Sequence, residues 1–143
     1  MRKRANEPLW LCGDLKAELP AWFTQRFQAR YTARSPFSSG MPGNLGLQPL
    51  PENPDGVLVS GPERAVLEML SEVGIHQGIE EARNILEGIR SLRPDALGKL
   101  LAHCRRVKVA RLCVLWAEEL GLPWADAARK GAGRWSQPFP KPW

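Results

Sequence analysis

Apolar residues recur at helical spacing through the second half of the chain. Between residues 60 and 120 they stand three and four positions apart, which is the period of a helix with one buried face. Gly74, Pro94 and Gly121 interrupt the pattern, and both residue types end helices. The pattern predicts helices at about 60–74, 79–92, 95–104 and 107–120, followed by a short turn at 124–129.

The first of these helices has the clearest start. Pro62 falls in its first turn, and Glu63 follows Ser60 at three residues, which is the spacing of a capping box. In that motif the Ser oxygen and the Glu carboxylate each accept a hydrogen bond from an otherwise unsatisfied backbone N–H. We therefore expect Ser60 and Glu63 to cap the helix.

The first half of the chain has a different pattern. Apolar and polar residues alternate at 26–33, as in a half-buried strand, and the apolar run at 9–12 predicts another strand. A third apolar run, at 57–59, is interpreted as a brief buried strand. The segment 35–56 is rich in Pro and Gly, which predicts a loop or a set of tight turns. One helical turn is expected within 15–23.

Short strands followed by short helices predict an α+β fold, with a small N-terminal β-sheet packed against a C-terminal layer of about four helices. A length of 143 residues suits one domain. Hydrophobic residues make up 43% and charged residues 24%, which excludes a wholly disordered chain and a coiled-coil rod. We expect one domain over 1–143, with a strand-rich part at 1–58, a helical part at 59–130 and a tail at 131–143.

Residues that carry catalysis or bind metals are few. The three cysteines, Cys12, Cys104 and Cys113, show no C-x-x-C spacing and are interpreted as buried hydrophobes. The two histidines, His76 and His103, have no metal-binding or nucleophile motif around them. We therefore expect no enzymatic activity, no catalytic residue, no metal site and no cofactor.

The sequence also lacks the usual signals for membrane insertion or secretion. It has no run of about 18 apolar residues, and no apolar stretch follows its basic start. We expect a cytoplasmic protein with no membrane partner.

Charge is segregated along the chain, whose net charge is +5. Residues 1–34 carry seven Lys or Arg and three acids, and residues 93–143 carry ten and four. Residues 35–92, in contrast, carry three Lys or Arg and eight acids. Basic ends around an acidic middle suit a phosphate backbone or an acidic partner protein.

One candidate nucleic-acid site lies at the start of the last long helix. Arg105, Arg106, Lys108 and Arg111 place four cations within seven residues. Arginine suits phosphate because its planar guanidinium donates two parallel hydrogen bonds. The alternatives are a solvated helix face, or cations that bind the carbonyls at the end of the preceding helix.

A second candidate nucleic-acid site is formed by Arg26, Arg30 and Arg34. Their spacing places all three side chains on one face of a strand, with Tyr31 nearby. Such a row can contact nucleic acid or an acidic protein. The alternative is an ordinary exposed face that pairs with acids from residues 62–92.

The tail combines aromatic residues with prolines, a composition poorly suited to full solvation. Trp135, Phe139 and Trp143 are its large side chains. We expect them to pack either on their own domain or on a neighbouring chain, as an oligomer or partner contact.

Two phrases carry a family resemblance. The more specific one, S-x-P-E-R-A-x-L-E-x-L, spans Ser60–Leu70, and R-V-K-x-x-R-L spans Arg106–Leu112. Weaker similarity lies in LPAWF at 19–23 and RSPF at 34–37. With these phrases, residues 9–124 resemble the C-terminal domain of the AbiEi family of antitoxins, from type IV toxin–antitoxin (abortive infection) systems.

The resemblance implies a bacterial regulator that represses its own promoter and counters a partner nucleotidyltransferase toxin. In the family, an N-terminal winged helix contributes DNA recognition, and the C-terminal domain carries the antitoxin activity and aids repression. No winged-helix segment precedes Leu9, so we expect a stand-alone C-terminal domain that lacks the main DNA-reading element of the family. The predicted function is a DNA-associated antitoxin-like regulator, and a homodimer is its expected assembly. The alternative is a protein-interaction or oligomerisation module without DNA binding.

Overall fold

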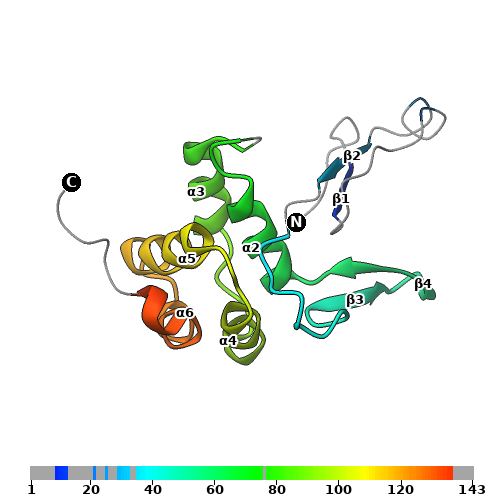
Figure 1. Ribbon diagram of the computed structural model, residues 1–143. Coiled ribbons are helices and arrows are strands. Elements are labelled where there is room, and N and C mark those ends of the chain that lie inside the picture. Colours follow the sequence, from blue (N-terminus) through cyan, green and yellow to red (C-terminus); the bar gives the residue numbers. More distant parts are fainter. Residues whose placement is uncertain are drawn as a thin grey trace. The chain divides into compact units, whose positions relative to one another are not determined.

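Strands lead and helices follow along the chain in the computed structural model (Figure 1), which confirms the α+β class. The chain forms two compact units, Met1–Ser35 and Pro36–Trp143. The expected division of one domain at residues 58 and 130 stays a prediction. The structure describes residues 9–12, 21, 25, 29–32, 35–75 and 77–136.

The described part of the N-terminal unit is a pair of parallel strands. β1 (Leu9–Cys12) and β2 (Ala29–Thr32) pair residue for residue without a shift. The first strand is confirmed as predicted, and the strand predicted at 26–33 is confirmed over its central part. The helical turn predicted within 15–23 lies outside the described residues except at Ala21.

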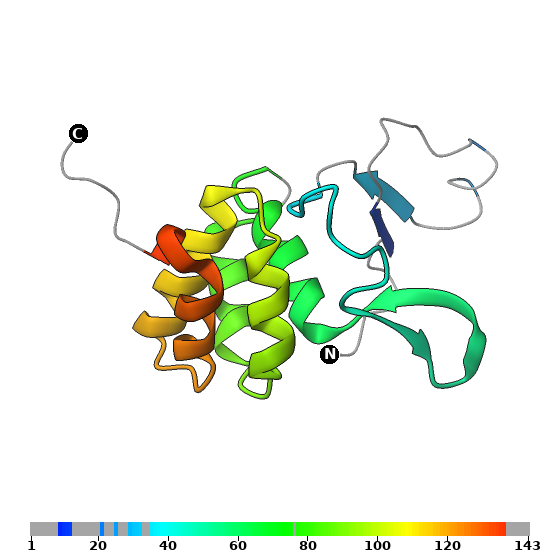
Figure 2. The same cartoon turned by 60° about the horizontal axis from the view of Figure 1, so that its bottom comes forward.

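The C-terminal unit begins with an antiparallel hairpin that the sequence did not predict. β3 (Leu47–Leu50) and β4 (Asn53–Ser60) form it, so the prediction of a loop at 35–56 is wrong in its second half. The prolines argued against strands because proline has no N–H to donate to a neighbouring strand. In a two-stranded sheet, however, each strand has an outer edge, where a missing N–H costs no hydrogen bond between the strands. The hairpin extends outward from the start of the helices in both views (Figures 1 and 2).

A long bulge interrupts this hairpin. Pro49 pairs with Leu58, but the next pair lies at the turn, so residues 54–57 leave the ladder. Val57 is 76% exposed and Leu58 is 47% exposed. The prediction of a buried strand at 57–59 is therefore right about the strand and wrong about its burial.

Helix α2 (Pro62–Ser71) starts close to the predicted residue but without the predicted capping box. The Ser60 hydroxyl donates to the Glu68 carboxylate at 2.5 Å instead. Glu63, only 1% exposed, accepts hydrogen bonds from the Arg93 backbone N–H at 2.9 Å and from its guanidinium at 3.3 Å. Both side chains of the expected box thus make contacts with residues distant in the sequence.

The remaining helices follow the predicted order with two corrections. The helix predicted to end at residue 92 ends at Glu87, with Gly88 as its C-cap. The turn predicted at 124–129 is a helix of eight residues, which makes five α-helices among the described residues instead of four. After α2 come α3 (Ile79–Glu87), α4 (Pro94–Ala102), α5 (Val107–Glu119), α6 (Ala125–Ala132) and the 3-10 helix η1 (Gly133–Ser136).

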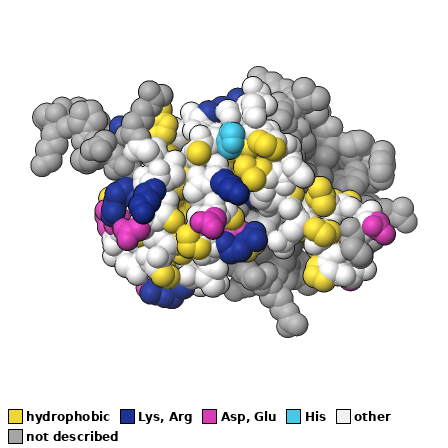
Figure 3. Space-filling model, turned by 90° about the horizontal axis from the view of Figure 1, so that it is seen from below, with side chains coloured by type: hydrophobic (Ala, Val, Ile, Leu, Met, Phe, Trp, Pro, Cys, Tyr) yellow, Lys and Arg dark blue, Asp and Glu magenta, His cyan; other side chains and the backbone are white. Residues whose placement is uncertain are grey.

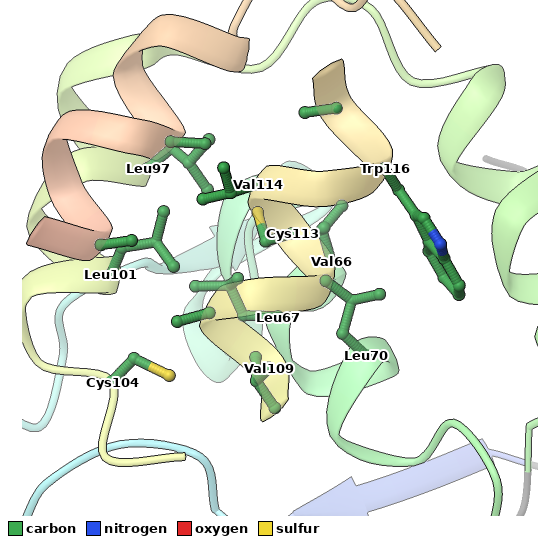
Figure 4. Close-up of a cluster of buried hydrophobic side chains, with 14 of the residues drawn as sticks. Val66, Leu67, Leu70, Leu97, Leu101, Cys104, Val109, Cys113, Val114 and Trp116 are labelled. Carbon is green, nitrogen blue, oxygen red and sulfur yellow. The ribbon is translucent and has the colours of Figure 1, made fainter. Parts of the chain in front are cut away.

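The centre of the hydrophobic core of this unit lies between α2, α4 and α5, and α3 and α6 add further buried residues to it. Figure 4 shows the side chains of α2, α4 and α5 converging, with Leu67 and Cys113 both fully buried. Burial raises the pKa of the Cys113 thiol to about 12, and it also raises the pKa of Cys104. These two cysteines are therefore buried hydrophobes, as predicted. The labelled core residues are Val66, Leu67, Leu70, Leu97, Leu101, Cys104, Val109, Cys113, Val114 and Trp116.

Helices α4 and α6 lie in direct backbone contact. A Cβ atom added at Gly131 of α6 would lie 2.8 Å from the Cα atom of Gly98 in α4 and 2.9 Å from its carbonyl oxygen. A Cβ added at Gly98 would find its nearest atom, the Ala127 carbonyl oxygen, at 4.0 Å. The crossing therefore requires glycine at position 131 and tolerates alanine at position 98.

We predict that Gly131→Ala lowers the free energy of unfolding by about 1–3 kcal/mol, because the new methyl group must push two helix backbones apart. The matched control is Gly98→Ala, which fits in the available space and gains up to about 1 kcal/mol from helix propensity. Urea unfolding of both variants measures the difference. Equal losses at the two positions would contradict the described crossing.

Candidate nucleic-acid interface

The connection between α4 and α5 is held in place by backbone hydrogen bonds. Residues 36–38 run antiparallel to it, with a β-bridge between Phe37 and Cys104. The Ser38 N–H donates to the His103 carbonyl at 2.8 Å, and the Arg105 N–H donates to the Pro36 carbonyl at 2.8 Å. This pairing fixes the backbone of the loop that carries the first two cations of the cluster.

Phe37 anchors the pairing segment in the core. Its side chain is 4% exposed, and the Arg64 guanidinium lies over the ring, 5.2 Å from the centroid. Arg64 also donates to the Leu45 carbonyl at 2.8 Å and pairs with Glu68 at 3.4 Å. One arginine of α2 therefore ties residues 37–45 to the helices.

The predicted cations Arg105, Arg106, Lys108 and Arg111, here called the basic corner, lie where the chain enters α5. Arg106 is the N-cap residue of this helix, and the first three of the four residues are exposed. Arg111 is half-buried, and the three arginines also interact within the chain. Their binding of phosphate stays a prediction.

Lys108 serves the fold as well. Its ammonium group donates to the Val73 carbonyl at 2.5 Å, just beyond the end of α2. Lys108 therefore binds a carbonyl near a helix end, but this carbonyl follows α2, whereas the alternative named the preceding helix, α4. Lys108 remains exposed over part of its surface.

The second predicted cluster cannot be placed in the same way. Arg30 lies in β2, at the position that pairs with Trp10, and its side chain is outside the description. Arg26 and Arg34 lie outside the described residues, so the shared face with Tyr31 stays a prediction.

Of the tail aromatics, Trp135 is described. It lies in η1, is half-buried and packs against the core of its own unit. Phe139 and Trp143 lie outside the described residues. A partner contact through these three side chains stays a prediction.

Several other cations are neutralised by acids. The Arg83 guanidinium lies 2.9 Å from the Glu119 carboxylate, and Arg129 lies 2.7 Å from Glu118 and 3.0 Å from Asp126. In the face shown in Figure 3, Lys and Arg side chains lie at separate places, several of them beside acidic side chains. Charge on this face is therefore local, and the basic corner has to be considered by itself.

The structure adds one cation that the sequence analysis did not select. Lys99, in the last turn of α4, is exposed, and so is Ala102 at three residues further. This exposed stripe of α4 leads into Arg105 and Arg106. The signal was present in the sequence as helical spacing, but Lys99 stands six residues before the cluster and was not grouped with it.

Two kinds of feature, a metal site and a membrane-spanning helix, are absent from the described residues. Among the described residues, no group of three His, Cys, Asp or Glu side chains is placed to hold a metal ion. No helix within this part of the chain is long and apolar enough to cross a bilayer. Of the two histidines, His103 is half-buried and His76 lies outside the described residues.

Comparison with known proteins gives one match. A family model described as "Transcriptional regulator, AbiEi antitoxin, Type IV TA system" matches residues 6–131. No curated protein matches the chain, and no solved structure does. The match includes the phrases at Ser60–Leu70 and Arg106–Leu112. Since the model covers most of its length, the chain belongs to the AbiEi antitoxin family of transcriptional regulators from type IV toxin–antitoxin systems.

Proposed function

We propose that this chain is a non-enzymatic regulator that associates with DNA through the basic corner. The observation that carries the proposal is the position of Arg105 and Arg106, two exposed cations on a loop whose backbone is fixed by residues 36–38. A fixed backbone lowers the entropic cost of placing the guanidinium groups against a phosphate. Lys99 and Lys108 extend the cationic surface on either side along the chain.

The start of α5 supports this proposal electrostatically. The N-terminal end of a helix carries partial positive charge, which an acidic side chain in the first turn commonly offsets. The first turn of α5 contains no acid and holds Lys108 instead. An external anion is therefore favoured there by both the helix dipole and the cations. The other four α-helices among the described residues have first-turn acids, namely Glu63 in α2, Glu80 and Glu81 in α3, Asp95 in α4 and Asp126 in α6.

Binding of this kind positions the protein on DNA without reading its sequence. Phosphate contacts are the same for every sequence and release counterions, so affinity falls as salt rises. The operator sequence is then read elsewhere in the regulatory system. This division agrees with the contribution of a C-terminal domain that aids repression.

The wider role follows from the family. We infer that the regulator acts in the bacterial cytoplasm together with a toxin, by resemblance a nucleotidyltransferase, whose effect it counters. The second candidate function is a protein-interaction or oligomerisation module, and the exposed apolar residues of the β3–β4 hairpin favour it.

We predict that replacing Arg105 and Arg106 together by Ala weakens binding to duplex DNA and lowers the slope of log K against log salt by about 2, one unit for each lost phosphate contact. Fluorescence anisotropy titrations at several salt concentrations measure both effects. Arg129→Ala is the matched control, because Glu118 and Asp126 already neutralise this arginine. Binding that is indifferent to salt, or equally weakened by the control, would exclude the mechanism.

We predict that two substitutions separate the roles of Lys108. Lys108→Ala removes the hydrogen bond to the Val73 carbonyl and lowers the free energy of unfolding by about 1 kcal/mol, in addition to weakening DNA binding. Lys108→Gln retains a donor while removing the charge, so it weakens DNA binding with a smaller loss of stability. Thermal unfolding and anisotropy on the same samples test this, and unchanged DNA affinity in both variants would assign Lys108 to the fold alone.

A further inference from the structure

The β3–β4 hairpin carries an apolar and acidic surface. Pro49, Val57 and Leu58 are its exposed apolar residues, and Glu52 and Asp55 are its exposed acids. These five residues, here called the hairpin surface, lie in a stretch without any Lys or Arg between residues 35 and 63. On the right of Figure 3, hydrophobic and acidic colours appear over the hairpin without the colour of Lys or Arg.

The exposed apolar side chains indicate an interaction site. A two-stranded hairpin is marginally stable in water, and it gains stability when its apolar side chains are covered. Val57 is 76% exposed and Leu58 is 47% exposed, and Leu58 pairs across the ladder with the exposed Pro49. Adjacent exposed apolar residues rimmed by charge are typical of a contact surface.

Charge selects the chemistry of the partner. Glu52 and Asp55 repel a phosphate backbone, which makes nucleic acid a poor occupant of the hairpin surface. Two hairpin surfaces packed face to face would bring their acids together, and opposed like charges are destabilising. The occupant must therefore be cationic, and the chain itself presents such a surface at the exposed residues Arg105 and Arg106.

We propose that the hairpin surface of one copy docks on the basic corner of a second copy. When each copy offers both surfaces, two equivalent contacts around a two-fold axis close a dimer. The contact itself does not require DNA binding, but its regulatory consequence rests on the proposed function, because both anionic partners use the basic corner. It adds regulation: the same guanidinium groups cannot hold a hairpin and a phosphate at once, so self-association and DNA binding compete.

Sedimentation velocity of the full chain over a series of concentrations tests the contact. The wild type is expected to self-associate reversibly, and Leu58→Ser and Asp55→Lys are each expected to weaken association about tenfold. Arg105→Glu is expected to weaken it similarly, and combining it with Asp55→Lys restores association because the ion pair is reversed. Glu87→Lys is the matched control: it reverses an exposed acid of α3 and leaves association unchanged.

Four results would overturn the inference: a wild type that stays monomeric, association unaffected by Asp55→Lys, a double variant that fails to recover, or a control as disruptive as Asp55→Lys. Asp55→Lys should leave DNA affinity undiminished. A wild type that self-associates without binding DNA would exclude the proposed function but not the contact between copies. A wild type that binds DNA but stays monomeric would exclude the contact alone.

Discussion

The pairing of residues 36–38 with the α4–α5 connection is the contact on which the candidate site depends. Amphipathic helices can form a core by themselves, but their packing does not fix the backbone of the loop between two of them. Here Phe37 is buried in the core and two backbone hydrogen bonds join its neighbours to His103 and Arg105. The site is thus positioned by a segment almost 70 residues away in the sequence.

The phrase at Ser60–Leu70 is explained by the same requirement. Its polar side chains make internal contacts: Ser60 bonds to Glu68, Arg64 stacks on Phe37 and binds the Leu45 carbonyl, and Glu63 holds the start of α4. Buried polar groups are stabilising when each finds a partner and costly otherwise. The phrase therefore specifies how the N-terminal loop and α4 attach to α2. It does not itself describe a binding surface.

The helices were predictable from the sequence because their information is local. The period of apolar residues located α2, α4 and α5 to within two or three residues of their ends. The prediction of a capping box was wrong because Glu63 binds Arg93, 30 residues away in the sequence, and no local sequence pattern indicates such a partner. The hairpin was not predicted because its prolines counted against strands, and the shift of register within it has no local signal in the sequence. At the candidate site, the cluster of cations was visible, whereas the bond from Lys108 to Val73 and the pairing with residues 36–38 required the fold.

The distribution of charge decides how the basic corner can act. Residues 36–143 carry 13 Lys or Arg and 12 Asp or Glu, so this unit has almost no net charge to attract a polyanion from a distance. At physiological ionic strength, salt screens exposed charges beyond about 8 Å. The attraction that a phosphate feels is therefore set by the charges close to it and not by the net charge of the unit. Arg129 and Arg83 pair with neighbouring acids, and the first turn of α5 contains no acidic residue of its own. The attraction of a polyanion to the basic corner therefore acts only at short range. An acidic group that is bound at the basic corner would block this attraction. An acidic hairpin on a second copy meets that condition without any change in the fold.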